Sequence, residues 1–74
     1  MNMDILQGRW KEVKGSIKHW WGLITDDDLN YIEGNWDKLI GKLQERYGYS
    51  RDQAEKEVND FLSMPDDRRR RRTA

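Results

Sequence analysis

Apolar side chains recur along this chain at steps of three and four residues, the spacing that places them on one face of a helix. One series of this kind occupies residues 6–24, a second occupies residues 29–47, and a shorter third occupies residues 54–62. No segment shows the strict alternation expected of a half-buried strand. The pattern therefore predicts an all-α protein. The expected helices cover about residues 3–21, 26–47 and 51–62.

The middle helix is long and contains Gly34, so it either continues through that residue or divides into a short and a longer helix. We accordingly expect three or four helices. Thr25 and Ser50 precede helical segments as N-cap residues, and Gly22 and Gly48 follow aromatic residues where a left-handed residue closes a helix.

The apolar series also predicts the hydrophobic core, because residues on one helical face are buried together. Trp20 and Trp21 are adjacent, about 100° apart on a helix, so only one of them is expected to be fully buried. The predicted core is Leu6, Trp10, Val13, Ile17, Trp21, Ile32, Trp36, Leu39, Leu43, Tyr47, Val58 and Phe61. The alternative for the tryptophans is an exposed aromatic platform that contacts a base or a peptide.

One segment of the sequence is repeated. Residues 8–15 read GRWKEVKG and residues 34–41 read GNWDKLIG, and flanking apolar positions also correspond. The two copies are 26 positions apart, and a structural unit of about that length cannot bury its apolar face alone. The repeat therefore predicts an internal pseudo-duplication, with two similar halves packed against each other.

The glycines of the repeat do not follow from the predicted core. At about 100° per residue, Gly8 and Gly15 lie almost opposite the apolar stripe of the first helix. A glycine in an exposed helix interior costs about 1 kcal/mol relative to alanine. Gly8, Gly15, Gly34 and Gly41 therefore form a candidate partner face that another helix approaches closely, or they mark helices whose weak stability is tolerated.

Composition and charge define the boundaries of the domain. The chain has 74 residues, enough for one small domain, and 38% of them are charged against 35% hydrophobic. Residues 1–63 contain 9 basic and 12 acidic side chains, and this segment is the predicted helical domain. Residues 64–74 have a net charge of +3 and are predicted to be a disordered, arginine-rich tail.

The tail contains the sharpest functional feature of the sequence. Five consecutive guanidinium groups can neutralise phosphates, which predicts weak nucleic-acid binding, or they can meet anionic lipid. The alternatives are a solubilising tail, or one that folds back on the acidic domain. The candidate nucleic-acid contacts are Arg68, Arg69, Arg70, Arg71 and Arg72.

Several kinds of chemistry are not expected. The chain contains no cysteine, which excludes disulfides and thiolate metal sites and suits the cytoplasm. No apolar run is long enough to span a membrane. Asp26, Asp27 and Asp28 are spaced as expected at a helix N-terminus, and their spacing does not match a calcium-binding loop. His19 is the single histidine, and the sequence shows no serine or cysteine nucleophile in a recognisable setting that it could activate. We expect no enzymatic activity, no metal and no cofactor.

The ordered motifs resemble the CsbD-like family of small bacterial general-stress proteins. They are Gly8-x-Trp10-x-x-x-x-Gly15, Trp21-Gly22, Thr25-Asp26-Asp27-Asp28, Ile32-Glu33-Gly34, Gly41-x-x-Gln44-Glu45-Arg46-Tyr47-Gly48 and Asp52-Gln53-Ala54-Glu55-Lys56-Glu57. The resemblance covers about residues 1–62, and the arginine tail is outside it. It implies two crosswise-packed α-hairpins with the outline of a SAM domain, and a non-enzymatic protective or adaptor role in the stress response.

Two other functions stay open beside that role. The basic tail favours a nucleic-acid-binding module, and the glycines favour a helical module that binds a protein partner. We expect the protein itself to be a monomer, and the sequence names no partner.

Overall fold

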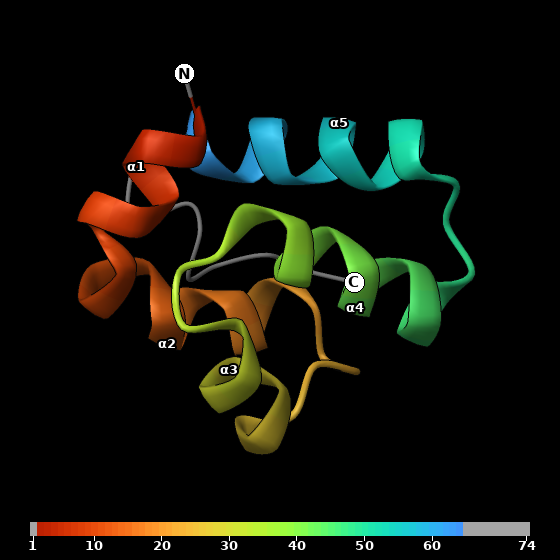
Figure 1. Cartoon of the computed structure of the whole chain (residues 1–74), viewed down its shortest axis with the longest axis horizontal. Helices are drawn as coiled ribbons and strands as arrows, with labels where there is room; N and C mark the ends of the chain where they lie inside the picture. The colour runs from red at the N-terminus through yellow and green to blue at the C-terminus, as the bar shows by residue number, and fades with distance from the viewer. Residues whose placement is uncertain (1, 65–74) are drawn as a thin grey trace.

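The computed structural model describes residues 2–64, and every regular element within that range is a helix (Figure 1). The prediction of an all-α bundle is confirmed. The helices are α1 (Asn2–Gly8), α2 (Trp10–Trp20), α3 (Asp26–Ile32), α4 (Trp36–Tyr47) and α5 (Arg51–Leu62). Because Pro65–Ala74 lie outside the described residues, the predicted boundary between domain and tail stays a prediction.

The described residues form five helices where the pattern predicted three or four. The expected helix over about 3–21 is divided at Arg9, whose φ of −115° and ψ of 23° are not helical. The middle segment is divided between Ile32 and Trp36, where Glu33 and Gly34 both have positive φ. Both divisions are local changes of backbone direction, and the apolar face continues across each of them.

Most helix ends are fixed as the sequence predicts. The Thr25 hydroxyl accepts from the Asp28 N–H at 3.1 Å, and the Asp28 carboxylate accepts from the Thr25 N–H at 3.1 Å. Ser50 caps α5, and Gly48 closes α4 with a left-handed φ of 72°. Gly22 does not close α2 in this way, because that helix already ends at the extended Trp21.

The core lies where the helices meet. Helix α4 packs against α1, α3 and α5, and α1 also packs against α2 and α5 (Figure 1). The predicted core residues that are buried are Leu6, Val13, Ile17, Trp21, Ile32, Leu39, Leu43, Val58 and Phe61, and they are joined by Ile24, Leu29, Ile40, Ala54 and Leu62. Trp10, Trp36 and Tyr47 differ from the expectation, because each packs against the core with only part of its surface buried.

An aromatic cluster joins the ends of α2 and α5. The rings of Trp21 and Phe61 lie 4.9 Å apart between centroids, and those of Trp20 and Phe61 lie 5.7 Å apart. Of the two adjacent tryptophans, Trp21 is buried and Trp20 is partly buried. The cluster holds the last turn of α5, and therefore the point where the described chain ends, beside α2.

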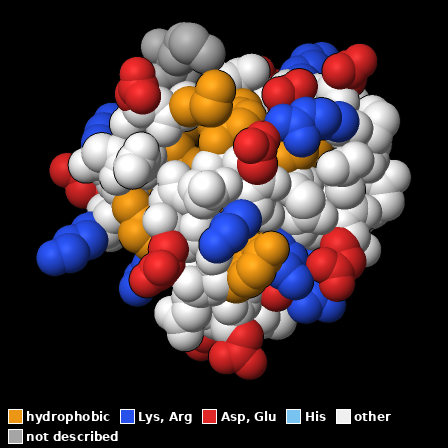
Figure 2. Space-filling model, in the orientation of Figure 1, with side chains coloured by type: hydrophobic (Ala, Val, Ile, Leu, Met, Phe, Trp, Pro, Cys, Tyr) orange, Lys and Arg blue, Asp and Glu red, His pale blue; other side chains and the backbone are white. Residues whose placement is uncertain are grey.

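No helix in residues 2–64 combines the length and the apolar composition needed to cross a membrane. On the face seen in Figure 2, hydrophobic side chains reach the surface in several separate places, with lysine, arginine, aspartate and glutamate side chains between them. The large apolar side chains that are exposed within the described residues are Met3, Leu23 and Tyr31.

Candidate functional site

The repeated sequence forms two helix junctions. In the first, Gly8 ends α1, Arg9 follows, and Trp10 begins α2. In the second, the turn after α3 contains Gly34 and Asn35, and Trp36 begins α4. Each copy of the repeat therefore places its tryptophan at the first position of a helix, directly after a change of backbone direction.

The second junction packs against the first. Gly34 has a φ of +80°, which an L side chain rarely adopts. A Cβ at this position would lie 3.4 Å from the Trp10 Cβ and 3.5 Å from the Gln7 Cα. Gly34 is buried, so it does not belong to an exposed partner face as the sequence suggested. Its role is to let the α3–α4 turn approach the α1–α2 junction.

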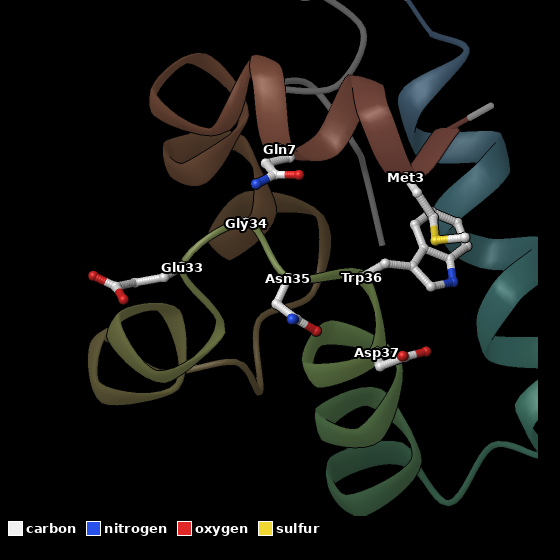
Figure 3. A pocket seen from close by; sticks show the side chains of 7 residues that line it. All are labelled: Met3, Gln7, Glu33, Gly34, Asn35, Trp36 and Asp37. Carbon is white, nitrogen blue, oxygen red and sulfur yellow. The ribbon is translucent and has the colours of Figure 1, made fainter.

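Two hollows flank this contact, and we call them the junction hollows. One has a volume of about 250 Å³ and is lined by Met3, Gln7, Glu33, Gly34, Asn35, Trp36 and Asp37 (Figure 3). The other has a volume of about 470 Å³ and is lined by Gln7, Gly8, Arg9, Trp10, Lys11, Glu12 and Glu33. Because Gln7 and Glu33 line both hollows, the two hollows lie side by side.

The tryptophans of the repeat are the main apolar groups of the junction hollows. Trp36 lines the first hollow, together with Met3 from α1, and Trp10 lines the second. Figure 3 places Met3 and Trp36 at one end of the first hollow and Glu33 at the other. The predicted burial of Trp10 and Trp36 is incomplete, because each also forms part of the wall of a hollow.

A third hollow adjoins the first through Asp37 and has a volume of about 380 Å³. Tyr31 forms one wall, and the ammonium groups of Lys38 and Lys42 lie 4.8 and 5.1 Å from the centre of its ring. These are distances at which a cation is attracted to an aromatic face. Gly41 lies on the same helix as the two lysines and leaves the hollow open.

The four repeat glycines therefore have different surroundings. A Cβ at Gly8, Gly15 or Gly41 would meet nothing within 4 Å, whereas Gly34 is enclosed. Gly8 and Gly41 each line a hollow, and Gly15 lies on the exposed face of α2 away from the hollows. The structure thus places the candidate partner residues in several locations rather than on one face.

A buried carboxylate connects α3 to α4. Asp28 is 3% exposed, and its two oxygens accept from Arg46 Nε and Nη2, each at 3.0 Å. Lys42 Nζ lies 3.5 Å from the same carboxylate. The hydrogen bonds from Arg46 hold the pKa of Asp28 far below its usual range, against the opposing effect of burial. The group is ionised at neutral pH and fixes the position of α3 on α4.

Sequence reasoning missed two features of this region. Asp28 was assigned only to the helix N-terminus, and its partner Arg46 is 18 residues away, so no local pattern connects them. The turn at Gly34 did have a local indication, because Gly-Asn before a periodic apolar segment marks a turn followed by an N-cap. The Asn35 side chain accepts from the Lys38 N–H at 3.0 Å, as such a cap requires.

The other candidate residues lie away from the hollows or outside the described chain. Arg68, Arg69, Arg70, Arg71 and Arg72 are outside the described residues. Within residues 2–64, no group of three or more histidine, aspartate or glutamate side chains is arranged to hold a metal ion. Asp26 pairs with Lys18 at 2.9 Å, and His19 is exposed near the end of α2.

Comparison with known proteins gives consistent matches. Residues 4–56 match the family model described as CsbD-like. The chain is 59% identical over 61 residues to the UPF0337 protein YjbJ of Escherichia coli K12, covering 82% of this chain and 88% of that protein. It is 54% identical over 61 residues to the UPF0337 protein PA4738 of Pseudomonas aeruginosa, covering 82% and 94%. No solved structure gives a significant match.

Proposed function

The chain belongs to the CsbD-like family, and we propose that it is a non-enzymatic stress-response protein that acts as an adaptor by holding a segment of a partner protein at the junction hollows. One observation supports this more than any other. Trp10 and Trp36 are incompletely buried, and each lines a hollow beside a glycine. Aromatic side chains in such positions are the typical anchors of protein interfaces.

The charged groups with shifted pKa values in the described chain indicate structural roles rather than catalysis. The described residues whose pKa departs clearly from its ordinary value are Asp28, Lys42, Arg46 and Arg51. All of them are engaged in ion pairs that favour the charged form. A general acid or base instead has a pKa moved toward neutrality by its surroundings. These groups therefore support structural roles.

The hollows indicate the chemistry of the partner segment. Each hollow has one partly exposed tryptophan, and Gln7 and Glu33 line both hollows. A matching segment has two apolar side chains, one for each hollow, and a polar or basic group between them to meet Glu33. This mixture of apolar and charged contacts is typical of interfaces that form and separate.

The proposal is tested by filling one hollow without disturbing the fold. Gly8→Glu adds a side chain where a Cβ meets nothing, and Gly15→Glu makes the same change at an equally open site away from the hollows. Nuclease-treated extracts of stressed cells are passed over each variant. We expect the wild type and Gly15→Glu to retain the same bound protein, and Gly8→Glu to lose it.

A deletion strain provides the independent test of the cellular role. We expect its survival to fall under osmotic, desiccation or stationary-phase stress, and to be restored by the wild-type chain but not by Gly8→Glu. Unchanged survival of the deletion strain under all three conditions would contradict the stress-response role, and equal capture by both glutamate variants would contradict the adaptor mechanism.

A further inference from the structure

We propose that Glu33 selects the partner segment by binding the charged head of a basic side chain, arginine in preference to lysine. The apolar stem of the same side chain lies in the first junction hollow, against Trp36. This inference rests on the adaptor role proposed above and narrows it. The apolar group in the first hollow and the basic group at Glu33 then belong to one residue of the partner.

The backbone of Glu33 has a conformation that glutamate rarely adopts. Glu33 follows α3 as its C-cap with a φ of 43° and a ψ of 44°, and within residues 2–64 it is the one residue other than glycine with a positive φ. Glycine or asparagine commonly occupies such a position, because a Cβ there lies too close to the backbone. The turn before Gly34 needs a left-handed residue, and glycine would supply it with less strain. The glutamate side chain therefore indicates a role beyond the turn itself.

The carboxylate of Glu33 is exposed and available to a ligand. It forms no ion pair with another residue of the range 2–64. Asp37, the other acid that lines the first hollow, already accepts from Arg51 Nη2 at 2.7 Å. Asp28, at the other end of α3, is bound by Arg46. Among these three acids around α3 and the turn that follows it, Glu33 is the one whose charge is not neutralised by the fold.

The charges of the two junction hollows differ, and this difference decides where a cation lies. Among the described residues, the lining of the first hollow contains Glu33 and Asp37 and no lysine or arginine. In the second hollow, Glu12 pairs with Arg9 at 2.7 Å and Lys11 adds a positive charge. A basic side chain that reaches Glu33 is therefore more favourable in the first hollow than in the second.

The apolar end of the first hollow suits the stem of a long basic side chain. Met3 and Trp36 lie at one end of the hollow and Glu33 lies at the other (Figure 3). Lysine and arginine pack their methylene groups on apolar surface while their charged heads remain in polar surroundings. Arginine is favoured over lysine, because its planar guanidinium stacks on aromatic rings and donates two parallel hydrogen bonds to a carboxylate.

The test uses the full chain and capped single amino acids, because the partner is unidentified. N-acetyl amides of arginine, lysine and citrulline are titrated into isotopically labelled protein, and nuclear magnetic resonance follows the signals of Glu33, Gly34 and the Trp36 indole. Citrulline has the shape of arginine without its charge. We expect arginine to bind in the millimolar range and lysine more weakly. Citrulline should bind about tenfold more weakly than arginine, because its hydrogen bonds are not charge-assisted.

Two variants of Glu33 separate binding from structure. Glu33→Gln keeps the length of the side chain and should weaken arginine binding about tenfold. The control Asp27→Asn removes a charge from the exposed first turn of α3 and should change binding by less than about twofold. Glu33→Gly relieves the strain at positive φ, so it should raise Tm by about 4 °C while weakening binding at least as much as Glu33→Gln does. A purely structural role for Glu33 predicts no loss of binding.

Several results would overturn the inference. Equal binding of arginine and citrulline would show that charge does not matter, and unchanged binding to Glu33→Gln would show that this carboxylate is not the site. Tighter binding of lysine than of arginine would contradict the stated preference.

Capture from extracts distinguishes this inference from the adaptor proposal. If Glu33→Gln keeps the bound protein that Gly8→Glu loses, the adaptor proposal stands and selection by Glu33 is wrong. If both variants keep it, the adaptor proposal fails, whereas the titrations decide on their own whether Glu33 binds arginine.

Discussion

The two helix junctions come from the same repeated sequence but differ in how firmly they are held. At the second junction, Asn35 caps α4, Gly34 is enclosed by the first junction, and Asp28 connects α3 to α4. At the first, no side chain caps α2, and Gly8 has open space around it. The comparison teaches that one copy of the repeat determines the geometry of the fold, while the other leaves a hollow open at the surface.

The largest effect is expected from the buried ion pair, which has no counterpart at the first junction. Asp28→Asn should lower the free energy of unfolding by about 2 kcal/mol, because the buried carboxylate's two charge-assisted hydrogen bonds from Arg46 are lost. Urea titration at pH 7 measures this. The exposed neighbour offers a matched control, since Asp27→Asn should change stability by at most about 0.5 kcal/mol.

The same pair predicts how stability depends on pH. The pKa of Asp28 is lowered in the folded state, so its contribution is fully present above the unfolded value of about 3.9 and is lost as pH falls toward the folded pKa. The wild type should therefore lose more stability below pH 4 than Asp28→Asn does. Parallel acid dependence of the two chains would show that this carboxylate is not stabilised by Arg46.

A smaller effect is expected from the paired glycines, and the two should respond with opposite signs. Gly34→Ala should destabilise the fold by about 1 to 2 kcal/mol, because alanine is strained at this positive φ. Gly8→Ala should stabilise it by about 0.5 to 1 kcal/mol, because alanine favours the helix and meets no neighbour. Thermal unfolding of the two variants beside the wild type measures both, and a shared sign would contradict the difference between the junctions.

The cap of α4 is expected to have a smaller effect than Gly34 does. Asn35→Ala removes the acceptor for the Lys38 N–H and should cost about 1 kcal/mol. Asn35→Ser, which can supply an equivalent oxygen, should recover most of that loss. If urea titration shows alanine and serine to be equivalent, the cap does not contribute to holding the second junction.

Much of the fold follows from the sequence because helical periodicity is a local property. The positions of Leu6, Val13 and Ile17 predict both a helical face and its burial, and Thr25 and Ser50 predict helix starts from single side chains. The division at Arg9 was not predicted, since the apolar steps continue across it without interruption.

The candidate site was harder to predict because it depends on contacts between distant segments. Trp10 and Trp36 occupy core positions of the periodic pattern, yet each lines a hollow that it shares with residues of a distant segment. Gly34 is enclosed and Gly8 is open because the first junction packs against Gly34, and this contact joins it to Trp10, which lies 24 residues earlier in the sequence. Equivalent residues in a repeat thus acquire different roles from their tertiary neighbours.

The aromatic cluster at the ends of α2 and α5 also gives the protein a spectroscopic reporter of its own. Trp20 and Trp21 lie 6.4 Å apart with their planes at 74°, and both rings face Phe61 of α5. If α5 separates from α2, Phe61 leaves both indole rings and their surroundings change. Near-ultraviolet circular dichroism therefore follows the packing of α5 on α2 without any added label.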